Sequence, residues 1–183
     1  MQIAVIGTGY VGLVSGTCFS EFGYNVTCVD KDAAKIKRLE RDEIPIYEPG
    51  LEELVKKNHA AGRLHFTTDL AASVKSADVV FIAVGTPSRR GDGAADLIYV
   101  DSAAQEIAEN LAGFTVIATK STVPVGTARR IETIVNKTNP TADYDIASNP
   151  EFLREGSAIE DFMRPDRIVI GVEGERSKEV MKQ

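Results

Sequence analysis

The sequence contains few of the residues that build disulfide frameworks and metal sites. Two cysteines and two histidines occur in 183 residues. Cys18 lies in a helix-like stretch and Cys28 in a strand-like run, and their spacing fits neither a disulfide framework nor a metal site. We expect both thiols to be small core side chains, and we predict no bound metal. His59 and His65 are predicted at the surface or at a sheet edge.

Long apolar runs and clusters of basic residues are also absent. No stretch approaches the roughly 20 apolar residues of a membrane-spanning helix, and Met1 leads straight into a strand-like run without a basic, apolar leader. The formal net charge is -6, with no block rich in Lys and Arg, which argues against nucleic acid or a membrane surface as the main partner. We therefore expect a cytoplasmic protein that binds small molecules.

The patterning that is present predicts an α/β fold. At 183 residues and 43% hydrophobic, the chain can bury the core of one domain. Strand-like runs alternate with amphipathic stretches, which is typical of a Rossmann-like, doubly wound, mainly parallel sheet with helices on both faces. Strands are predicted at 3–6, 26–29, 64–67, 79–84, 115–119, 144–147 and 167–172. Helices are predicted at 11–22, 33–41, from Pro49 onward, 69–75 with Asp69 as N-cap, 99–111, 127–137 and 151–162.

A glycine-rich turn follows the first predicted strand. Gly7, Gly9 and Gly12 form a Gly-x-Gly-x-x-Gly pattern at the start of a helix-like stretch. In such a pattern the first glycine permits a tight turn, the second lets the backbone approach a pyrophosphate, and the third lets helix and strand pack closely. The free N–H groups and the positive dipole end of the helix would face the anion. The pattern predicts a dinucleotide-binding cradle.

Asp30 follows the second predicted strand, about 20 residues after the glycines, where a dinucleotide site places an acid for the adenosine ribose. A carboxylate there would accept hydrogen bonds from the ribose hydroxyls and repel a 2′-phosphate, which selects NAD over NADP. The alternative is that Asp30 merely caps the next helix. Lys35 could reach the same ribose, although a lysine on an exposed helix is often only solvated.

Further polar residues lie at the carboxyl ends of predicted strands, where open α/β sheets bind ligands. They are Gly85-Thr86-Pro87, Lys120-Ser121-Thr122 and Asn149-Pro150-Glu151. Glu151 and Glu155 would share one face of a predicted helix and could place two carboxylates over a bound substrate, but their spacing alone favours a solvated acidic face. Arg89 and Arg90 could neutralise a phosphate, but a charged loop tip is the simpler interpretation.

Five motifs resemble those of the UDP-glucose/GDP-mannose dehydrogenase family, over almost the whole chain. They are Gly-Thr-Gly-Tyr-Val-Gly at 7–12, Val-Gly-Thr-Pro-Ser at 84–88, Ser-Thr-Val-Pro-Val-Gly-Thr at 121–127, Asn-Pro-Glu-Phe-Leu-Arg-Glu-Gly at 149–156 and Arg-Pro-Asp-Arg at 164–167. The stretch Asp-Gly-Ala-Ala-Asp-Leu at 92–97 is most similar to the members that oxidise UDP-glucose. The resemblance implies oxidation of a nucleotide sugar's C6 alcohol to a carboxylate, by two successive hydride transfers to two NAD molecules.

The strand ends and the resemblance together imply roles for individual residues. Those expected to bind NAD are Gly7, Gly9, Tyr10, Val11, Gly12, Asp30, Lys35, Thr86, Pro87, Ser121, Thr122 and Glu155. Those expected to line the sugar substrate are Glu151, Phe152, Leu153, Arg154 and Glu155. Glu155, with Thr122, would handle the proton or the attacking water.

The family's catalytic cysteine lies in a Gly-Cys-Phe-Pro-Lys-like stretch, which neither Cys18 nor Cys28 fits. The family's later lysine and asparagine, its central dimer helix and its nucleotide-sugar domain have no counterpart either. Residues 1–183 are therefore interpreted as the NAD-binding domain of a larger homodimeric enzyme, inactive by itself. The alternatives are the same domain of a GDP-mannose or UDP-N-acetylhexosamine dehydrogenase, or a stand-alone NAD-binding module without chemistry.

Overall fold

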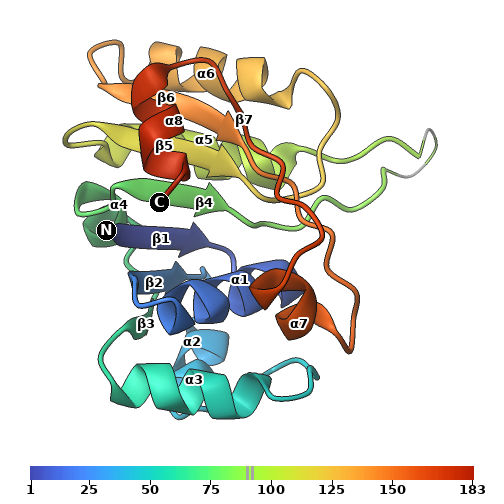
Figure 1. Cartoon of the computed structure of the whole chain (residues 1–183). Coiled ribbons are helices and arrows are strands. Elements are labelled where there is room, and N and C mark those ends of the chain that lie inside the picture. The colour runs from blue at the N-terminus through green and yellow to red at the C-terminus, as the bar shows by residue number, and fades with distance from the viewer. Residues whose placement is uncertain (90, 92) are drawn as a thin grey trace.

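The computed structural model describes residues 1–89, 91 and 93–183, so Arg90 and Asp92 lie outside the described residues. A seven-stranded sheet runs through the molecule in the order β3-β2-β1-β4-β5-β6-β7 (Figure 1). Its strands are β1 (Gln2–Ile6), β2 (Asn25–Val29), β3 (Leu64–Thr67), β4 (Val79–Ile82), β5 (Thr115–Thr119), β6 (Tyr144–Ser148) and β7 (Gly171–Val172). The first six strands are parallel, and β7 pairs antiparallel with β6. This order confirms the predicted doubly wound fold.

Helices cover both faces of the sheet. One face packs against α1 (Tyr10–Glu21), α2 (Ala33–Leu39), α3 (Leu51–Ala60), α7 (Ala158–Met163) and α8 (Glu175–Met181). The other face packs against α4 (Leu70–Lys75), α5 (Ile98–Asn110) and α6 (Thr127–Thr138). Asp69 caps α4 as predicted, because its carboxylate accepts a hydrogen bond from the Ala72 N–H at 2.9 Å.

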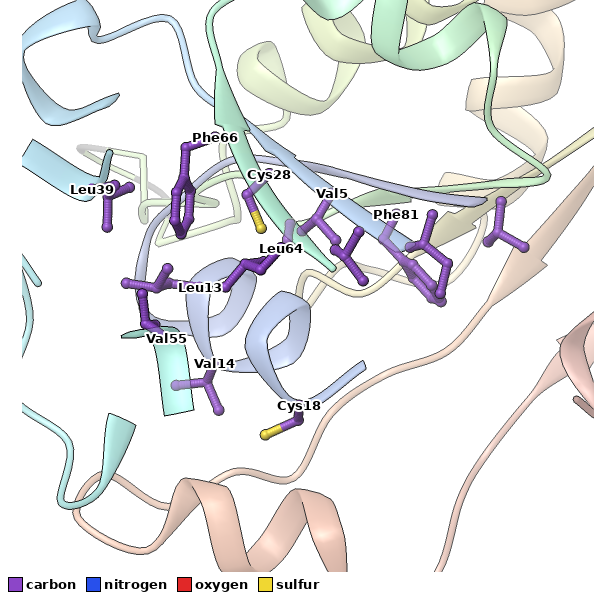
Figure 2. Packing of buried hydrophobic residues seen from close by; sticks show 14 of the residues in the cluster. Val5, Leu13, Val14, Cys18, Cys28, Leu39, Val55, Leu64, Phe66 and Phe81 are labelled. Atoms are coloured by element: carbon purple, nitrogen blue, oxygen red, sulfur yellow. The ribbon is translucent and has the colours of Figure 1, made fainter. Parts of the chain in front are cut away.

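Two apolar cores lie on opposite faces of the sheet, and side chains of the central strands alternate between them. In β4, Val79 and Phe81 pack on the α1 side, whereas Val80 and Ile82 pack on the α5 side. All four residues of β4 are buried, as expected of a central parallel strand. Figure 2 shows the core on the α1 side, including Leu13, Cys18 and Cys28.

Both cysteines belong to this core, as predicted. Their side chains are free thiols with no exposed surface. Burial raises the pKa of each thiol to about 12, with small contributions from nearby carboxylates at Cys18. Neither thiol therefore has the low pKa and exposure of a nucleophile.

Two predicted elements are wrong. The stretch 151–157 is a loop, and only Ala158–Met163 is helical. Its backbone N–H groups at Arg154 and Gly156 donate to the side-chain carboxylates of Asp161 and Glu48 instead of forming a helical ladder, and Gly156 has a φ of 87°. At 167–172, only Gly171–Val172 pairs with the sheet, and the apolar residues 168–170 are exposed.

A smaller difference concerns the start of α3. Pro49 was expected within its first turn, but the helix begins at Leu51, after Gly50 has turned the chain with a φ of 80°. This places Glu48 and Pro49 outside the helix, in the segment that leads to it. In the part of the chain that the structure describes, no helix is long and apolar enough to cross a membrane.

Candidate functional site

The carboxyl ends of the parallel strands meet at one edge of the sheet, on the right in Figure 1. The strand order reverses between β1 and β4, so the loops after these strands flank the crevice in which open α/β sheets bind ligands. The glycine-rich turn follows β1, and residues 83–87 follow β4. The two loops are in close contact, since a Cβ on Gly7 would lie 2.6 Å from the Ala83 carbonyl oxygen.

The glycine-rich turn is crowded on its inner side and open at Gly9. Gly7 has a φ of 104°, and a Cβ on Gly12 would lie 1.9 Å from the Gly7 carbonyl oxygen. A Cβ on Gly9 would meet nothing within 4 Å. Gly9 is also the N-cap of α1, and among the residues that the structure describes no side chain caps this helix end. The turn therefore leaves room for a phosphate group against the helix N-terminus.

The two residues after Gly9 form the first turn of α1. Tyr10 and Val11 are both half-buried and pack against the core on the α1 side. The hydroxyl of Tyr10 donates a hydrogen bond to the Glu48 carboxylate. Burial and this bond raise the pKa of Tyr10 to about 12.

Asp30 lies at the end of β2 with both carboxylate oxygens engaged. Oδ2 accepts hydrogen bonds from the Thr8 N–H at 3.0 Å and the Thr8 hydroxyl at 2.7 Å, and it pairs with Lys35 Nζ at 2.8 Å. Oδ1 accepts from the Asp32 N–H at 3.0 Å. Burial by itself would raise the pKa of Asp30, but the bonds from Lys35, Thr8 and Asp32 outweigh it and lower the pKa to about 2.

The alternative reading of Asp30 as a helix cap is wrong. Asp32 caps α2, because its Oδ1 accepts hydrogen bonds from the N–H groups of Ala34 and Lys35. Asp30 is instead fixed beside the glycine-rich turn, ionised and oriented by Thr8. Lys35 in α2 pairs with Asp30 beside the turn, whereas its position in the sequence did not decide between a ribose contact and a solvated lysine. Thr8 was missed, and its place between two cradle glycines is the one signal that could have identified it.

The loops after β4 and β5 are joined by side-chain hydrogen bonds. The Thr86 hydroxyl donates to the Thr122 carbonyl oxygen at 3.0 Å, and the Ser121 hydroxyl donates to the Val84 carbonyl oxygen at 2.7 Å. Pro87 accepts a hydrogen bond from the Asp96 N–H at 2.8 Å, which closes the base of the loop that follows. Thr122 and Pro87 are exposed and Thr86 is half-buried, so the predicted residues of both loops lie together at the strand ends.

Lys120, at the end of β5, has only 5% of its surface exposed. Its Nζ donates to the Asn149 side-chain oxygen at 3.0 Å and lies 5.3–6.0 Å from the ring centroids of Phe162, Phe81 and Phe19. Burial lowers the pKa of Lys120 to about 8, and the charge of Glu151 opposes this shift only in part. The sequence placed Lys120 at a strand end but did not indicate that it is buried.

The predicted substrate residues lie on the loop between β6 and α7. An open cavity of about 1300 Å³ beside this loop is lined by Glu151, Phe152, Leu153 and Arg154, together with Lys120 and Asn149. Glu155 is exposed and does not line this cavity. Because 151–157 is not helical, Glu151 and Glu155 do not share a helix face, and that expectation is wrong.

Individual contacts fix this loop. Glu151 accepts a hydrogen bond from the Leu153 N–H at 2.6 Å. Arg154 forms hydrogen bonds with Asp161 through its backbone N–H at 2.9 Å and through its guanidinium at 3.1 and 2.6 Å. Phe152 is exposed, with the guanidinium of Arg167 5.5 Å from its ring centroid.

The remaining candidates lie away from this edge or outside the described residues. His59 contacts Asp42 at 2.8 Å, and His65 lies on the edge strand β3, as predicted. The Arg89 backbone N–H donates to Ala94 within the loop after β4. Arg90, and Asp92 at the start of the 92–97 stretch, are not described.

Comparison with known proteins gives one consistent match. Residues 1–183 match the NAD binding domain of the UDP-glucose/GDP-mannose dehydrogenase family. The chain is 65% identical over 185 residues to a UDP-glucose 6-dehydrogenase of Rhizobium meliloti, covering all of this chain and 42% of the relative. It is 51% identical over 183 residues to the UDP-glucose 6-dehydrogenase TuaD of Bacillus subtilis, covering all of this chain and 40% of TuaD.

Solved structures agree with these matches. A UDP-glucose dehydrogenase from Pyrobaculum islandicum superposes with a TM-score of 0.95 at 41% identity, over 98% of this chain and 42% of that structure. A ternary complex of a GDP-mannose dehydrogenase from Pseudomonas aeruginosa gives a TM-score of 0.95 at 35% identity, over 100% of this chain and 43% of that structure. The chain therefore spans less than half the length of these relatives.

Proposed function

Because the chain belongs to the UDP-glucose/GDP-mannose dehydrogenase family and matches the family's NAD-binding domain, we propose that it is the NAD-binding part of an enzyme that oxidises UDP-glucose to UDP-glucuronate. NAD would supply the hydride acceptor, with one NAD molecule used for each of the two oxidation steps. The single observation that supports this proposal most is the pairing of an open backbone at Gly9 with an oriented, ionised Asp30 at the end of β2. These two features suit a pyrophosphate and an adenosine ribose, respectively.

In this proposal the chain's own residues bind and orient the cofactor. The α1 N-terminus at Gly9 holds the pyrophosphate, and Asp30 accepts hydrogen bonds from the ribose hydroxyls. The carboxylate would repel a 2′-phosphate, although Lys35 beside it offsets part of this charge. Val11, Thr86, Pro87, Ser121 and Thr122 lie around the same strand ends and complete the cofactor site.

The loop 149–156 carries the proposed substrate residues. Glu155 is exposed and held between two anchored neighbours, Arg154 and Gly156, which suits a group that moves a proton to or from substrate or water. Thr122, also exposed at a strand end, is its proposed partner. Glu151 to Arg154 would line the sugar, since they line the cavity beside the loop.

The identity of the sugar, the further domains and the assembly belong to the same proposal. UDP-glucose is favoured because two relatives of high identity are UDP-glucose 6-dehydrogenases. GDP-mannose or a UDP-N-acetylhexosamine is the alternative. We propose that nucleotide-sugar-binding domains beyond this one supply the nucleophilic cysteine and the dimer contact. A cytoplasmic enzyme agrees with the two free, buried thiols.

Calorimetric titration with NAD and NADP tests the cofactor assignment. The chain should prefer NAD, and Asp30→Ala should weaken NAD binding and relax the preference. Asp32→Ala is the matched control, because it removes a carboxylate two residues away that only caps α2. Equal or tighter NADP binding by the unmodified chain would contradict the role of Asp30.

The activity is tested by following NADH absorbance with UDP-glucose and NAD. A full-length version should produce NADH from UDP-glucose in preference to GDP-mannose. The 183-residue chain should produce none in the steady state, because Cys18 and Cys28 are buried and protonated. Sustained NADH production by this chain, abolished by Cys18→Ser or Cys28→Ser, would contradict the proposal of a longer enzyme.

A further inference from the structure

Glu48 is a buried carboxylate that the proposed function does not use. Only 6% of its surface is exposed, and it lies in the segment before α3. An ionised carboxylate is rarely buried unless it is fully hydrogen-bonded. Glu48 meets this condition through partners that are far away in the sequence.

Those partners belong to two different elements of the site. Oε2 accepts hydrogen bonds from the Tyr10 hydroxyl and from the Gly156 N–H at 2.8 Å, and Oε1 accepts from the Ala158 N–H at 2.8 Å. Tyr10 opens α1 directly after Gly9 of the cradle. Gly156 and Ala158 lie at the junction between the substrate loop and α7. One carboxylate therefore joins the cradle helix to the loop.

The contacts at the loop fix the backbone next to Glu155. Ser157, the N-cap of α7, makes no capping hydrogen bond with its side chain, and Glu48 supplies the acceptor instead. On the other side of Glu155, the Arg154 N–H donates to Asp161 of α7. Glu155 thus projects from a short stretch that is anchored at both neighbours, once by α7 and once by Glu48.

Apolar contacts between α1 and α7 strengthen this link. The ring of Phe162 in α7 packs edge-on against Phe19 of α1, with centroids 5.1 Å apart. Near the start of α3, the side of Gly50 on which a Cβ would point faces the Ile159 side chain, since such a Cβ would lie 3.8 Å from the Ile159 Cδ1. Movement of the first turn of α1 would therefore be transmitted to the loop through a packed and hydrogen-bonded connection.

We propose that Glu48 is a positioning residue, which couples NAD binding at the cradle helix to the placement of Glu155 through its hydrogen bonds to Tyr10, Gly156 and Ala158. This inference rests on the proposed function, since it assigns NAD to the cradle and a catalytic role to Glu155. The proposed function assigns Glu48 a contact with neither ligand. A carboxylate that only capped α7 would anchor the loop equally well with or without NAD.

Hydrogen–deuterium exchange of the segment 149–163, with and without NAD, separates these two roles. The variants are Glu48→Gln and Tyr10→Phe, with Glu52→Gln as matched control. Glu52 lies on α3 close to Glu48 in sequence, but it is exposed and pairs with Lys56 on the same helix. NAD affinity is first measured calorimetrically for each variant, and NAD is then added at a concentration that saturates that variant.

In the unmodified chain and in Glu52→Gln, NAD should slow exchange at residues 153–159. Glu48→Gln should exchange there roughly 10-fold to 100-fold faster without NAD, because an amide is a poorer acceptor than a charged carboxylate and its NH₂ group lacks a partner. Tyr10→Phe keeps the cap on α7, so its exchange without NAD should stay close to that of the unmodified chain. The NAD-dependent slowing should be lost in both variants.

Two results would overturn the inference alone. One is full NAD-dependent slowing in Tyr10→Phe, and the other is calorimetric NAD binding to the unmodified chain with no change in exchange at 153–159. Failure of the unmodified chain to bind NAD would refute the proposed function together with this inference.

Discussion

Gly12 and Gly9 lie three residues apart in the glycine-rich turn, yet their replacement by alanine should affect different properties. A Cβ on Gly12 would lie 1.9 Å from the Gly7 carbonyl oxygen, 3.0 Å from the Gly7 carbonyl carbon and 3.3 Å from the Ala83 Cβ. A Cβ on Gly9 would meet no atom of the described residues within 4 Å. Gly9 also has a φ of -72°, which alanine adopts without strain.

The cost at Gly12 follows from these distances. The Gly7 atoms that a Cβ would meet are backbone atoms, so relief requires α1 to move away from β1 and its buried neighbours. Overpacking of this kind costs about 1–3 kcal/mol and occasionally more, and a clash with backbone belongs at the upper end. Alanine recovers about 1 kcal/mol as the better helix former. Gly12→Ala should therefore lose at least ~2 kcal/mol of unfolding free energy.

Thermal and urea unfolding followed by circular dichroism would measure this loss. In a chain of this size, ~2 kcal/mol corresponds to a fall in Tm of about 4–8 °C. Gly9→Ala should unfold within ~0.5 kcal/mol of the unmodified chain, as is usual for an exposed position without contacts. Its NAD affinity, measured calorimetrically, should fall at least ~10-fold, because the new methyl group would occupy the surface that the pyrophosphate approaches.

The comparison can refute the reasoning at either position. A Gly12→Ala variant as stable as the unmodified chain would show that the helix and the turn are not in the close contact described. A Gly9→Ala variant with unchanged NAD affinity would show that the open side of the turn does not face the cofactor. Equal losses of stability in both variants would remove the distinction between a packing glycine and a binding glycine.

Three further predictions concern titratable groups. Because hydrogen bonds lower the pKa of Asp30 from 3.8 to about 2, the ionised carboxylate should add about 2 kcal/mol to the free energy of unfolding above pH 3.8, and this stabilisation should be lost as the pH falls towards 2. Asp30→Asn should lack this pH dependence in urea unfolding, and a variant with the pH profile of the unmodified chain would contradict the prediction. Because burial lowers the pKa of Lys120 from 10.5 to about 8, the free energy of unfolding of the unmodified chain should rise by about 3 kcal/mol relative to that of Lys120→Met as the pH rises from 8 to 10.5. A difference in unfolding free energy that stays constant over this range would show that the lysine is not desolvated. In a full-length version, Glu155→Gln should lower kcat by about 10²–10⁴-fold with little change in Tm, and near-normal turnover would return Glu155 to a solvated surface role.

The sequence alone was sufficient to predict the sheet and the cradle. The apolar runs that became β1, β4 and β5 were recognisable because central parallel strands are buried on both faces and therefore carry little polarity. Gly7 and Gly12 were recognisable because only glycine fits the contacts that the turn makes with its neighbours. The distance along the chain from the cradle to Asp30 is set by the length of one βαβ unit, so the spacing of these residues was enough to predict where Asp30 lies.

Other features depend on contacts between distant segments. The stretch 151–157 has the composition of a helix, but its N–H groups find better acceptors in Asp161 and Glu48. The apolar run 168–170 resembles a strand, because hydrophobicity indicates a tendency to be buried and does not specify a pairing partner. Lys120 is a strand-end lysine in the sequence, and its burial among three aromatic rings comes from α1, β4 and α7.

Glu48 is the clearest case of a residue whose role only the tertiary structure decided. In the sequence it is one acid of Tyr47-Glu-Pro-Gly, in front of a helix, and nothing in that spacing distinguishes it from a surface residue. Its partners lie 38, 108 and 110 residues away. Periodicity and motif spacing report contacts within one element or one turn. A carboxylate that joins two elements across such separations is defined by the packing of α1, α3 and α7, and therefore by the folded chain.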